Sequence, residues 1–146
     1  MITKHGRRRA IPLAMTALLG AAGMFLSAES LAADKAYGCA CLHNSKTSGT
    51  INYRFRWGQH EWKSVALGKG KSETMCWAYK DAPKSPELEF QLDVDMTGGT
   101  KWETFSIPRG QSNSVSCSAV PSQAHYHVGY VANSNKKKIQ IYPGKS

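Results

Sequence analysis

Two short runs of this chain have residue types and spacings that suit a metal ion. Cys39, Cys41 and His43 alternate with other residues, and His125 and His127 do the same. Side chains two apart on a β-strand point to the same face, so each run can direct its sulfur or nitrogen atoms at one ion. Imidazole and thiolate are ligands that suit copper and zinc. Both runs are therefore candidate copper or zinc sites.

The pair His125 and His127 is incomplete taken alone. Zinc sites in proteins use at least three protein ligands, and the residues around this pair supply no third one. It would have to come from His43, His60 or a carboxylate elsewhere in the fold. The alternative is that both are half-exposed histidines on the solvent-exposed face of a strand and bind no ion.

The reading of the cysteines depends on the compartment in which the chain folds. In an oxidising compartment, an even number of cysteines is typical of disulfides. Cys39 and Cys41 are too close in sequence to bond each other without strain, so each needs a distant partner, and only Cys76 and Cys117 remain. Two pairings stay open. We favour Cys39 with Cys76 and Cys41 with Cys117, and free thiolates holding a metal are the alternative.

The N-terminus has the pattern of an export signal. A basic start, Lys4 and Arg7 to Arg9, precedes an uncharged stretch over 10–28. Ser30-Leu31-Ala32 places small residues where a signal peptidase reads them. We expect cleavage after Ala32, which divides the chain into a signal peptide, 1–32, and one domain, 33–146, in the periplasm or outside the cell. A retained membrane anchor is the alternative, because the apolar stretch is almost long enough to span.

The chain is basic, and part of that charge lies in the expected signal. The formal net charge is +9, from 19 Lys and Arg against 10 Asp and Glu. Loss of 1–32 removes four basic residues and one acidic residue, which leaves +6. No later segment is apolar over the length that a membrane span requires. A basic exported domain attracts polyanions, so the candidate partners are a polyanionic envelope ligand or another exported protein.

The elements that must position these residues are predicted to be β-strands, because apolar and polar residues alternate and no helical period persists. We expect eight strands, over 51–57, 61–67, 73–79, 87–96, 101–107, 112–119, 125–132 and 138–142. Turns rich in Gly, Pro and Asn separate them. This spacing predicts an all-β fold, an antiparallel β-sandwich or small barrel of about eight strands.

One predicted strand offers a candidate ligand surface. The apolar residues of 51–57 share one face and are expected in the core, so Arg54 and Arg56 point to solvent. Together with nearby lysines they would form a basic surface for a polyanion. Exposed aromatic rings on a β-face would stack on sugar rings or bases.

The sequence carries no pattern of an enzyme. It lacks G-x-S-x-G, H-E-x-x-H, a P-loop and G-x-G-x-x-G. Disulfide formation would remove the cysteines as nucleophiles. We therefore predict a non-catalytic binding or structural protein that needs no cofactor. The alternative is a periplasmic copper- or zinc-binding protein.

Overall fold

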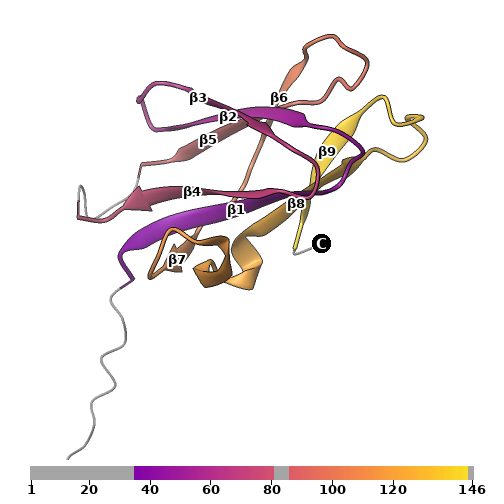
Figure 1. Cartoon of the computed structure of the whole chain (residues 1–146). Helices are drawn as coiled ribbons and strands as arrows, with labels where there is room; N and C mark the ends of the chain where they lie inside the picture. Colours follow the sequence, from indigo (N-terminus) through magenta and orange to yellow (C-terminus); the bar gives the residue numbers. More distant parts are fainter. Residues whose placement is uncertain (1–34, 81–85, 145–146) are drawn as a thin grey trace, which may run out of the picture. The chain divides into compact units, whose positions relative to one another are not determined.

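The computed structural model describes residues 35–80 and 86–144, and the expected signal peptide lies outside them. The described residues form nine strands (Figure 1). They are β1 (Tyr37–Lys46), β2 (Ile51–Trp57), β3 (Lys63–Leu67), β4 (Ser72–Ala78), β5 (Leu88–Asp93), β6 (Trp102–Phe105), β7 (Gly110–Ser112), β8 (His125–Tyr130) and β9 (Ile139–Pro143). Two 3₁₀ helices, η1 (Cys117–Ala119) and η2 (Ser122–Ala124), lie between β7 and β8.

The strands form two sheets that pack face to face. One sheet has the order β4-β1-β8-β9, with β7 also paired to β1, and we call it the cysteine sheet. The other has the order β3-β2-β5-β6, and we call it the arginine sheet. The predicted all-β fold is confirmed as a sandwich-like pair of sheets. The small barrel is wrong, because neither sheet of the described chain closes on itself.

Strand directions are antiparallel with one exception. β1 and β8 run parallel, with Cys41 opposite His125 and His43 opposite His127. Hairpin connections force neighbouring strands to be antiparallel, but the chain between β1 and β8 passes through the other sheet first. Because no short turn joins β1 to β8, the connection does not force them to run antiparallel.

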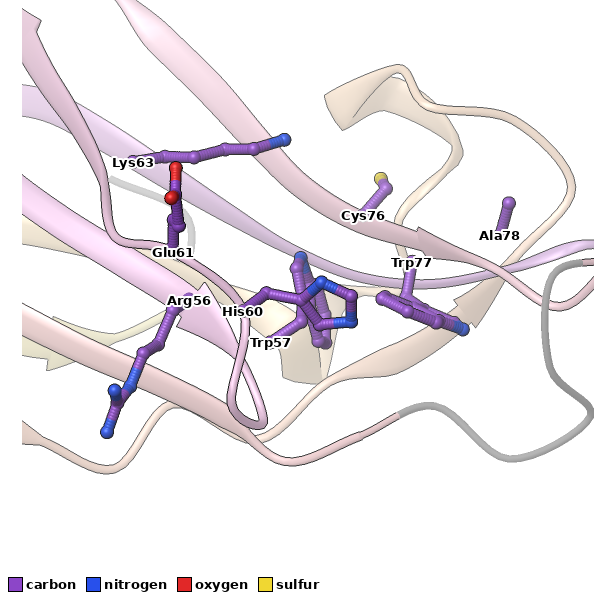
Figure 2. A pocket seen from close by; sticks show the side chains of 8 residues that line it. All are labelled: Arg56, Trp57, His60, Glu61, Lys63, Cys76, Trp77 and Ala78. Carbon is purple, nitrogen blue, oxygen red and sulfur yellow. The ribbon is translucent and has the colours of Figure 1, made fainter.

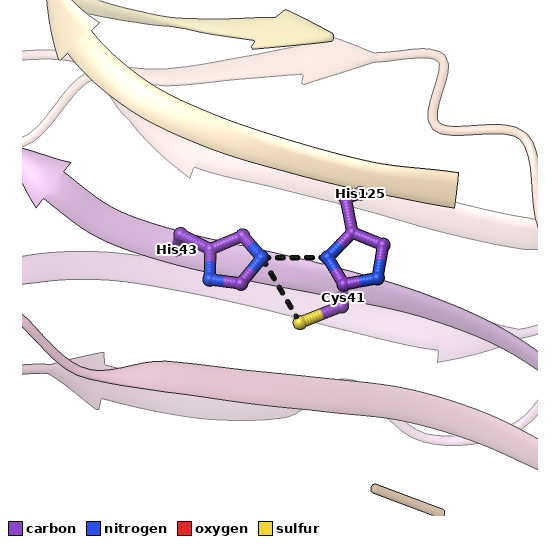
Figure 3. A group of neighbouring side chains, drawn as sticks. All are labelled: Cys41, His43 and His125. Atoms are coloured by element: carbon purple, nitrogen blue, oxygen red, sulfur yellow. Dashed lines mark hydrogen bonds between the residues drawn. The ribbon is translucent and has the colours of Figure 1, made fainter. Parts of the chain in front are cut away.

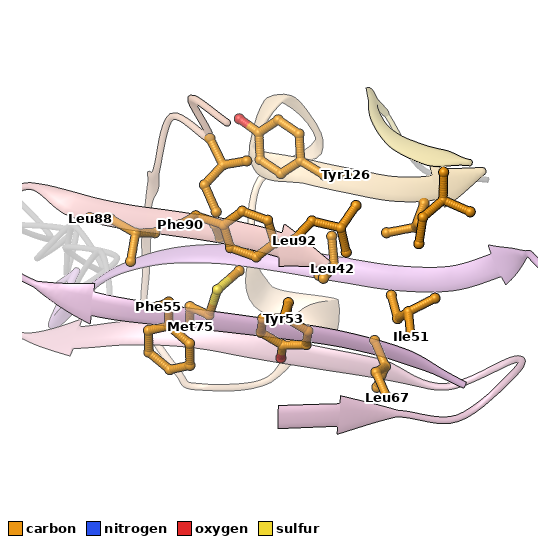
Figure 4. Close-up of a cluster of buried hydrophobic side chains, with 14 of the residues drawn as sticks. Leu42, Ile51, Tyr53, Phe55, Leu67, Met75, Leu88, Phe90, Leu92 and Tyr126 are labelled. Carbon is orange, nitrogen blue, oxygen red and sulfur yellow. The ribbon is translucent and has the colours of Figure 1, made fainter. Parts of the chain in front are cut away.

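The main core lies between the two sheets (Figure 4). Tyr53 and Phe90 enter it from the arginine sheet, and Leu42 and Met75 enter it from the cysteine sheet, all with no exposed surface. The alternation in 51–57 is confirmed, because Ile51, Tyr53, Phe55 and Trp57 are all buried. Arg54 and Arg56 consequently lie on the outer face of the arginine sheet.

A second, smaller core covers the outer face of the cysteine sheet. Cys39 and Cys41 of β1 pack there against Val120 and Ala124 from the η1–η2 segment. The strand expected over 112–119 is wrong, because β7 ends at Ser112 and the chain then bends into η1. Serine hydroxyls explain the difference: Ser112, Ser114 and Ser116 each accept the backbone N–H two residues ahead. Such local bonds compete with a strand ladder.

Both disulfides anchor strand β1. Cys39 bonds Cys76 of the neighbouring β4, across 37 residues of sequence. Cys41 bonds Cys117 of η1, across 76 residues. The favoured pairing is confirmed, and the described chain holds no free cysteine.

Replacing Tyr53 by phenylalanine is expected to stabilise the fold by about 1 kcal/mol, because a buried polar group without a partner costs free energy. Its hydroxyl is buried and finds no hydrogen-bond partner among the described residues. Burial, with a smaller contribution from the charge of Glu73, raises the pKa of Tyr53 above its ordinary value of 10.0. Because burial disfavours the ionised phenolate, this group leaves the free energy of unfolding independent of pH below about pH 10, and the fold loses stability as pH rises above that value.

Urea unfolding of the wild type and Tyr53→Phe at pH 7 and pH 10.5 would measure both effects. The variant should lose less stability between the two pH values than the wild type. Tyr142→Phe is the matched control, since its hydroxyl donates a 3.0 Å bond to the Tyr130 carbonyl and its loss should destabilise. A Tyr53→Phe variant that is less stable at pH 7 would contradict the expectation.

Candidate functional site

A cavity of about 280 Å³ opens where β2, the turn after it and β4 meet (Figure 2). Aromatic rings form its inner wall, and charged side chains form its rim. The residues that line it are Arg56, Trp57, His60, Glu61, Lys63, Cys76, Trp77 and Ala78. The cavity is near the lower end of the size range of small-molecule sites, about 300–1,000 Å³, so it suits a single ring.

The aromatic wall is built by a tight turn after β2. Gly58 has a φ of 54°, which only glycine adopts readily, and the His60 N–H bonds the Trp57 carbonyl at 3.0 Å. The turn brings the His60 ring to 5.5 Å from Trp77. The Trp57 and Trp77 rings lie tilted at 5.9 Å. The Trp77 Nε1–H is buried and has no acceptor within the described chain.

Two arginines and two tryptophans form a row on the outer face of the arginine sheet, and we call it the tryptophan–arginine face. The Arg54 guanidinium carbon lies 4.9 Å from the Trp62 ring centroid and 4.6 Å from that of Trp102. The Arg56 guanidinium carbon lies 4.8 Å from the Trp62 ring centroid. These distances are within the range of cation–π attraction. Because Arg56 also lines the cavity, the cavity and this face are contiguous.

Neighbouring strand β5 orients both guanidinium groups. Arg54 Nε donates to Gln91 Oε1 at 2.7 Å, and Arg56 forms an ion pair with Glu89 at 2.7 Å. The Arg56 side chain keeps 27% of its surface exposed. Exposed ion pairs contribute little to stability, so their effect here is to fix the direction of the arginines. A ligand anion at Arg56 would compete with Glu89.

A second cluster lies on the outer face of the cysteine sheet, where β1 and β8 run side by side (Figure 3). We call Cys41, His43, Ser72 and His125 the histidine cluster. His43 Nε2 lies 2.8 Å from His125 Nδ1 and 3.4 Å from Cys41 Sγ. His43 Nδ1 lies 2.6 Å from Ser72 Oγ. His125 is only 1% exposed.

The partners of His125 fix its tautomer. Its Nε2 lies 2.9 Å from the carbonyl oxygen of Val120. A carbonyl only accepts, so Nε2 carries the hydrogen and the neutral ring keeps the lone pair of Nδ1 directed at His43. His43 Nε2 then donates to that lone pair, and His43 Nδ1 accepts from the Ser72 hydroxyl. Both far nitrogens of the pair are thus held, and both near nitrogens face each other.

The residues predicted to bind a metal do not group in the way that their spacing in the sequence suggested. The structure pairs His125 with His43 rather than with His127, whose ring stacks on Tyr142 at 5.4 Å. The thiolate set is wrong, because Cys39 and Cys41 are both in disulfides. His43, one of the candidate third ligands for that pair, lies beside His125 in place of His127.

Sequence reasoning missed three contributors to these sites. Ser72 carries no motif, and only the pairing of β4 with β1 places it opposite His43. Trp62 and Trp102 lie outside the predicted Arg54–Arg56 surface in sequence and join it only across the sheet. The one available signal was the position of Trp102 at the start of an alternating segment, which put it on a single face with Thr104.

The chain was compared with protein families, curated proteins and solved structures, and no significant match was found. Within the described residues, no helix has the length and apolar character of a membrane span. The two disulfides are typical of an oxidising environment, as exported proteins meet. The two sites are therefore assigned from their own geometry.

Proposed function

We propose that this chain is a non-catalytic binding protein that holds an anionic glycan of the cell envelope on its tryptophan–arginine face. The observation that carries the proposal is the placement of Arg54 between the rings of Trp62 and Trp102. Flat aromatic rings beside fixed guanidinium groups suit a ligand made of rings that bear acidic groups. The chain's net positive charge would steer such a polyanion toward it.

Each part of the face has a chemical role in this proposal. The exposed parts of the indole rings would stack on the apolar side of a sugar ring. Guanidinium groups pair with carboxylate, sulfate or phosphate through two parallel hydrogen bonds. The cavity beside Arg56 would take one sugar unit against the partly exposed Trp77 ring and the exposed His60 ring.

The compartment agrees with this ligand class. Two disulfides persist where the surroundings are oxidising, and the expected signal peptide would deliver the chain to the periplasm or the cell exterior. Anionic polymers of the envelope are abundant there, whereas nucleic acid is not. We therefore place the protein in one of these two compartments and favour glycan over nucleic acid.

Heparin is a suitable probe of the proposal, because it is a polymer of sulfated and carboxylated sugar rings. We expect the mature domain to bind immobilised heparin and Arg54→Ala/Arg56→Ala to elute at clearly lower salt. Trp62→Ala keeps the charge but removes the stacking ring, and we expect about a tenfold weaker affinity for a heparin oligosaccharide by calorimetry. Glu89→Gln removes the competing carboxylate and should strengthen binding.

The matched control is Lys136→Ala/Lys137→Ala, which removes the same charge from the exposed turn between β8 and β9. It should shift elution much less than the arginine variant. Equal shifts would show that heparin responds to net charge alone, and the face would lose its role. Retention that is absent in the wild type would reject the proposed ligand class.

A further inference from the structure

We propose that His43 and His125 form a copper(I) site on the cysteine sheet, separate from the glycan surface. The two ring nitrogens that face each other, His43 Nε2 and His125 Nδ1, are 2.8 Å apart. Together with Cys41 Sγ, their ligand atoms all lie within 4.8 Å of one another. Cys41 and His43 belong to β1 and His125 belongs to β8, so only the parallel pairing of these two strands creates the site.

The surroundings of both rings match those of metal ligands. A metal-binding histidine usually donates its second ring N–H to a carbonyl, carboxylate or hydroxyl, which fixes the tautomer and aims the free nitrogen. His125 does so through the carbonyl of Val120 at 2.9 Å. His43 has the hydroxyl of Ser72 at 2.6 Å. A hydroxyl both donates and accepts, so His43 can also hold its hydrogen on Nδ1.

That choice decides what lies between the two rings. With the hydrogen on Nδ1, His43 donates to Ser72 and presents the lone pair of Nε2. Both near nitrogens then carry lone pairs directed at one point, and an ion takes the place of the shared hydrogen. In this exchange the His43 hydrogen moves from Nε2 to Nδ1 and stays on the ring, so the step balances without loss of a proton.

The geometry requires a small opening of the pair. Imidazole nitrogens lie about 2.0–2.1 Å from a bound metal, so two of them are separated by about 3.3 Å at a tetrahedral angle and about 4 Å when opposite each other. The observed separation of 2.8 Å would have to grow by roughly 0.5–1.2 Å. His125 is buried and held by Val120, so the half-buried His43 is the ring that moves.

The donor set favours copper(I) over zinc. Zinc prefers four ligands and often takes carboxylates, and the described part of the chain brings no carboxylate into this cluster. Copper(I) is a soft ion that accepts few ligands and tolerates sulfur. The Cys41 sulfur lies 3.4 Å from His43 Nε2 as part of a disulfide, where it is a weak third donor. Two imidazoles beside sulfur, next to the smaller apolar core, suit copper(I) best.

An anaerobic titration of the disulfide-intact domain with copper(I), against a colorimetric copper(I) chelator, tests the site. We expect one equivalent to be retained, with two nitrogen neighbours in the X-ray absorption spectrum. His43→Ala should weaken binding at least tenfold, and because His43 is only half buried this variant should fold. His127→Ala is the matched control: it removes a histidine from the same pair of strands and should leave copper binding unchanged.

Intact mass before and after the titration must show both disulfides, so that copper held by reduced thiols is recognised. No retained copper, or equal retention by the wild type and His43→Ala, would overturn the proposal. Equal losses in His43→Ala and His127→Ala would overturn the assignment to this pair. Preference for zinc in a parallel titration would overturn the choice of metal. None of these outcomes bears on heparin binding, so the two proposals stand or fall separately.

Discussion

Removal of the Cys41–Cys117 disulfide is expected to lower the free energy of unfolding by about 2–5 kcal/mol. The bridge closes a loop across 76 residues, and a cross-link over that length restricts the unfolded chain by about 4.5 kcal/mol in the chain-entropy model. It also fastens the η1–η2 segment over the smaller core, where Cys41 has no exposed surface. Alanine is the right replacement at both positions, because serine would bury a hydroxyl in an apolar cluster.

The other disulfide is the matched comparison. Cys39–Cys76 spans 37 residues, and the same relation makes its contribution smaller by about 0.6 kcal/mol. It also joins strands that already share a ladder, with Cys39 directly opposite Cys76. Guanidinium unfolding of Cys41→Ala/Cys117→Ala and Cys39→Ala/Cys76→Ala would measure the two losses. A loss below 1 kcal/mol in the first variant, or a clearly larger loss in the second, would contradict the argument.

Hydrogen exchange would locate the effect. Without the Cys41–Cys117 bond, backbone amides over 113–124 should exchange faster than those of β2 and β5, because the segment is then held only by a small apolar cluster and a few hydrogen bonds. The same loosening should reach Val120, whose carbonyl holds His125. The disulfide therefore supports the proposed copper site indirectly.

The fold class was predictable because most strands have one face in the core and one face exposed to solvent. In β2 and β5, buried and less buried residues alternate, and such alternation can be read directly from sequence. Strand β1 was not predicted, although it lies at the centre of the cysteine sheet. Its residues from Gly38 to Leu42 are all buried, since the main core covers one face and the η1–η2 segment the other. A strand buried on both faces loses the alternation that would reveal it.

The number of cysteines and the closeness of two of them excluded only the Cys39–Cys41 bond, and the strand register that places Cys39 opposite Cys76 was needed to choose between the other two pairings. The histidine pair was not predictable, because His43 and His125 are 82 residues apart and their contact depends on the register of two parallel strands. Local spacing emphasised His127 instead, which the register places opposite His43 in the ladder. Its ring goes to Tyr142. Spacing along one strand could name the histidines but could not choose between them.

Phe90→Ala is expected to lower the free energy of unfolding by about 3–5 kcal/mol, which is typical when a large buried ring is removed and a cavity remains. Phe90 has no exposed surface, and its ring lies 5.4 Å from that of Tyr53. It lies opposite Phe55 on one side and Phe105 on the other in the arginine sheet. These neighbours belong to the two flanking strands, β2 and β6, so they cannot all move inward to fill the space.

The two faces of β5 have different roles, because one packs in the core and the other orients the arginines. Glu89 and Gln91, on either side of Phe90, point outward and orient Arg56 and Arg54. Phe90→Ala should therefore reduce stability in urea while the folded fraction, measured at low temperature, keeps its affinity for a heparin oligosaccharide.

Val115→Ala is the control: its side chain is 55% exposed, and its free energy of unfolding should change by less than about 0.5 kcal/mol. Normal stability of Phe90→Ala would mean that the core refills the cavity. Loss of heparin affinity by a well-folded Phe90→Ala would mean that the outer face depends on the packing beneath it, and the two faces of β5 could not be treated as independent.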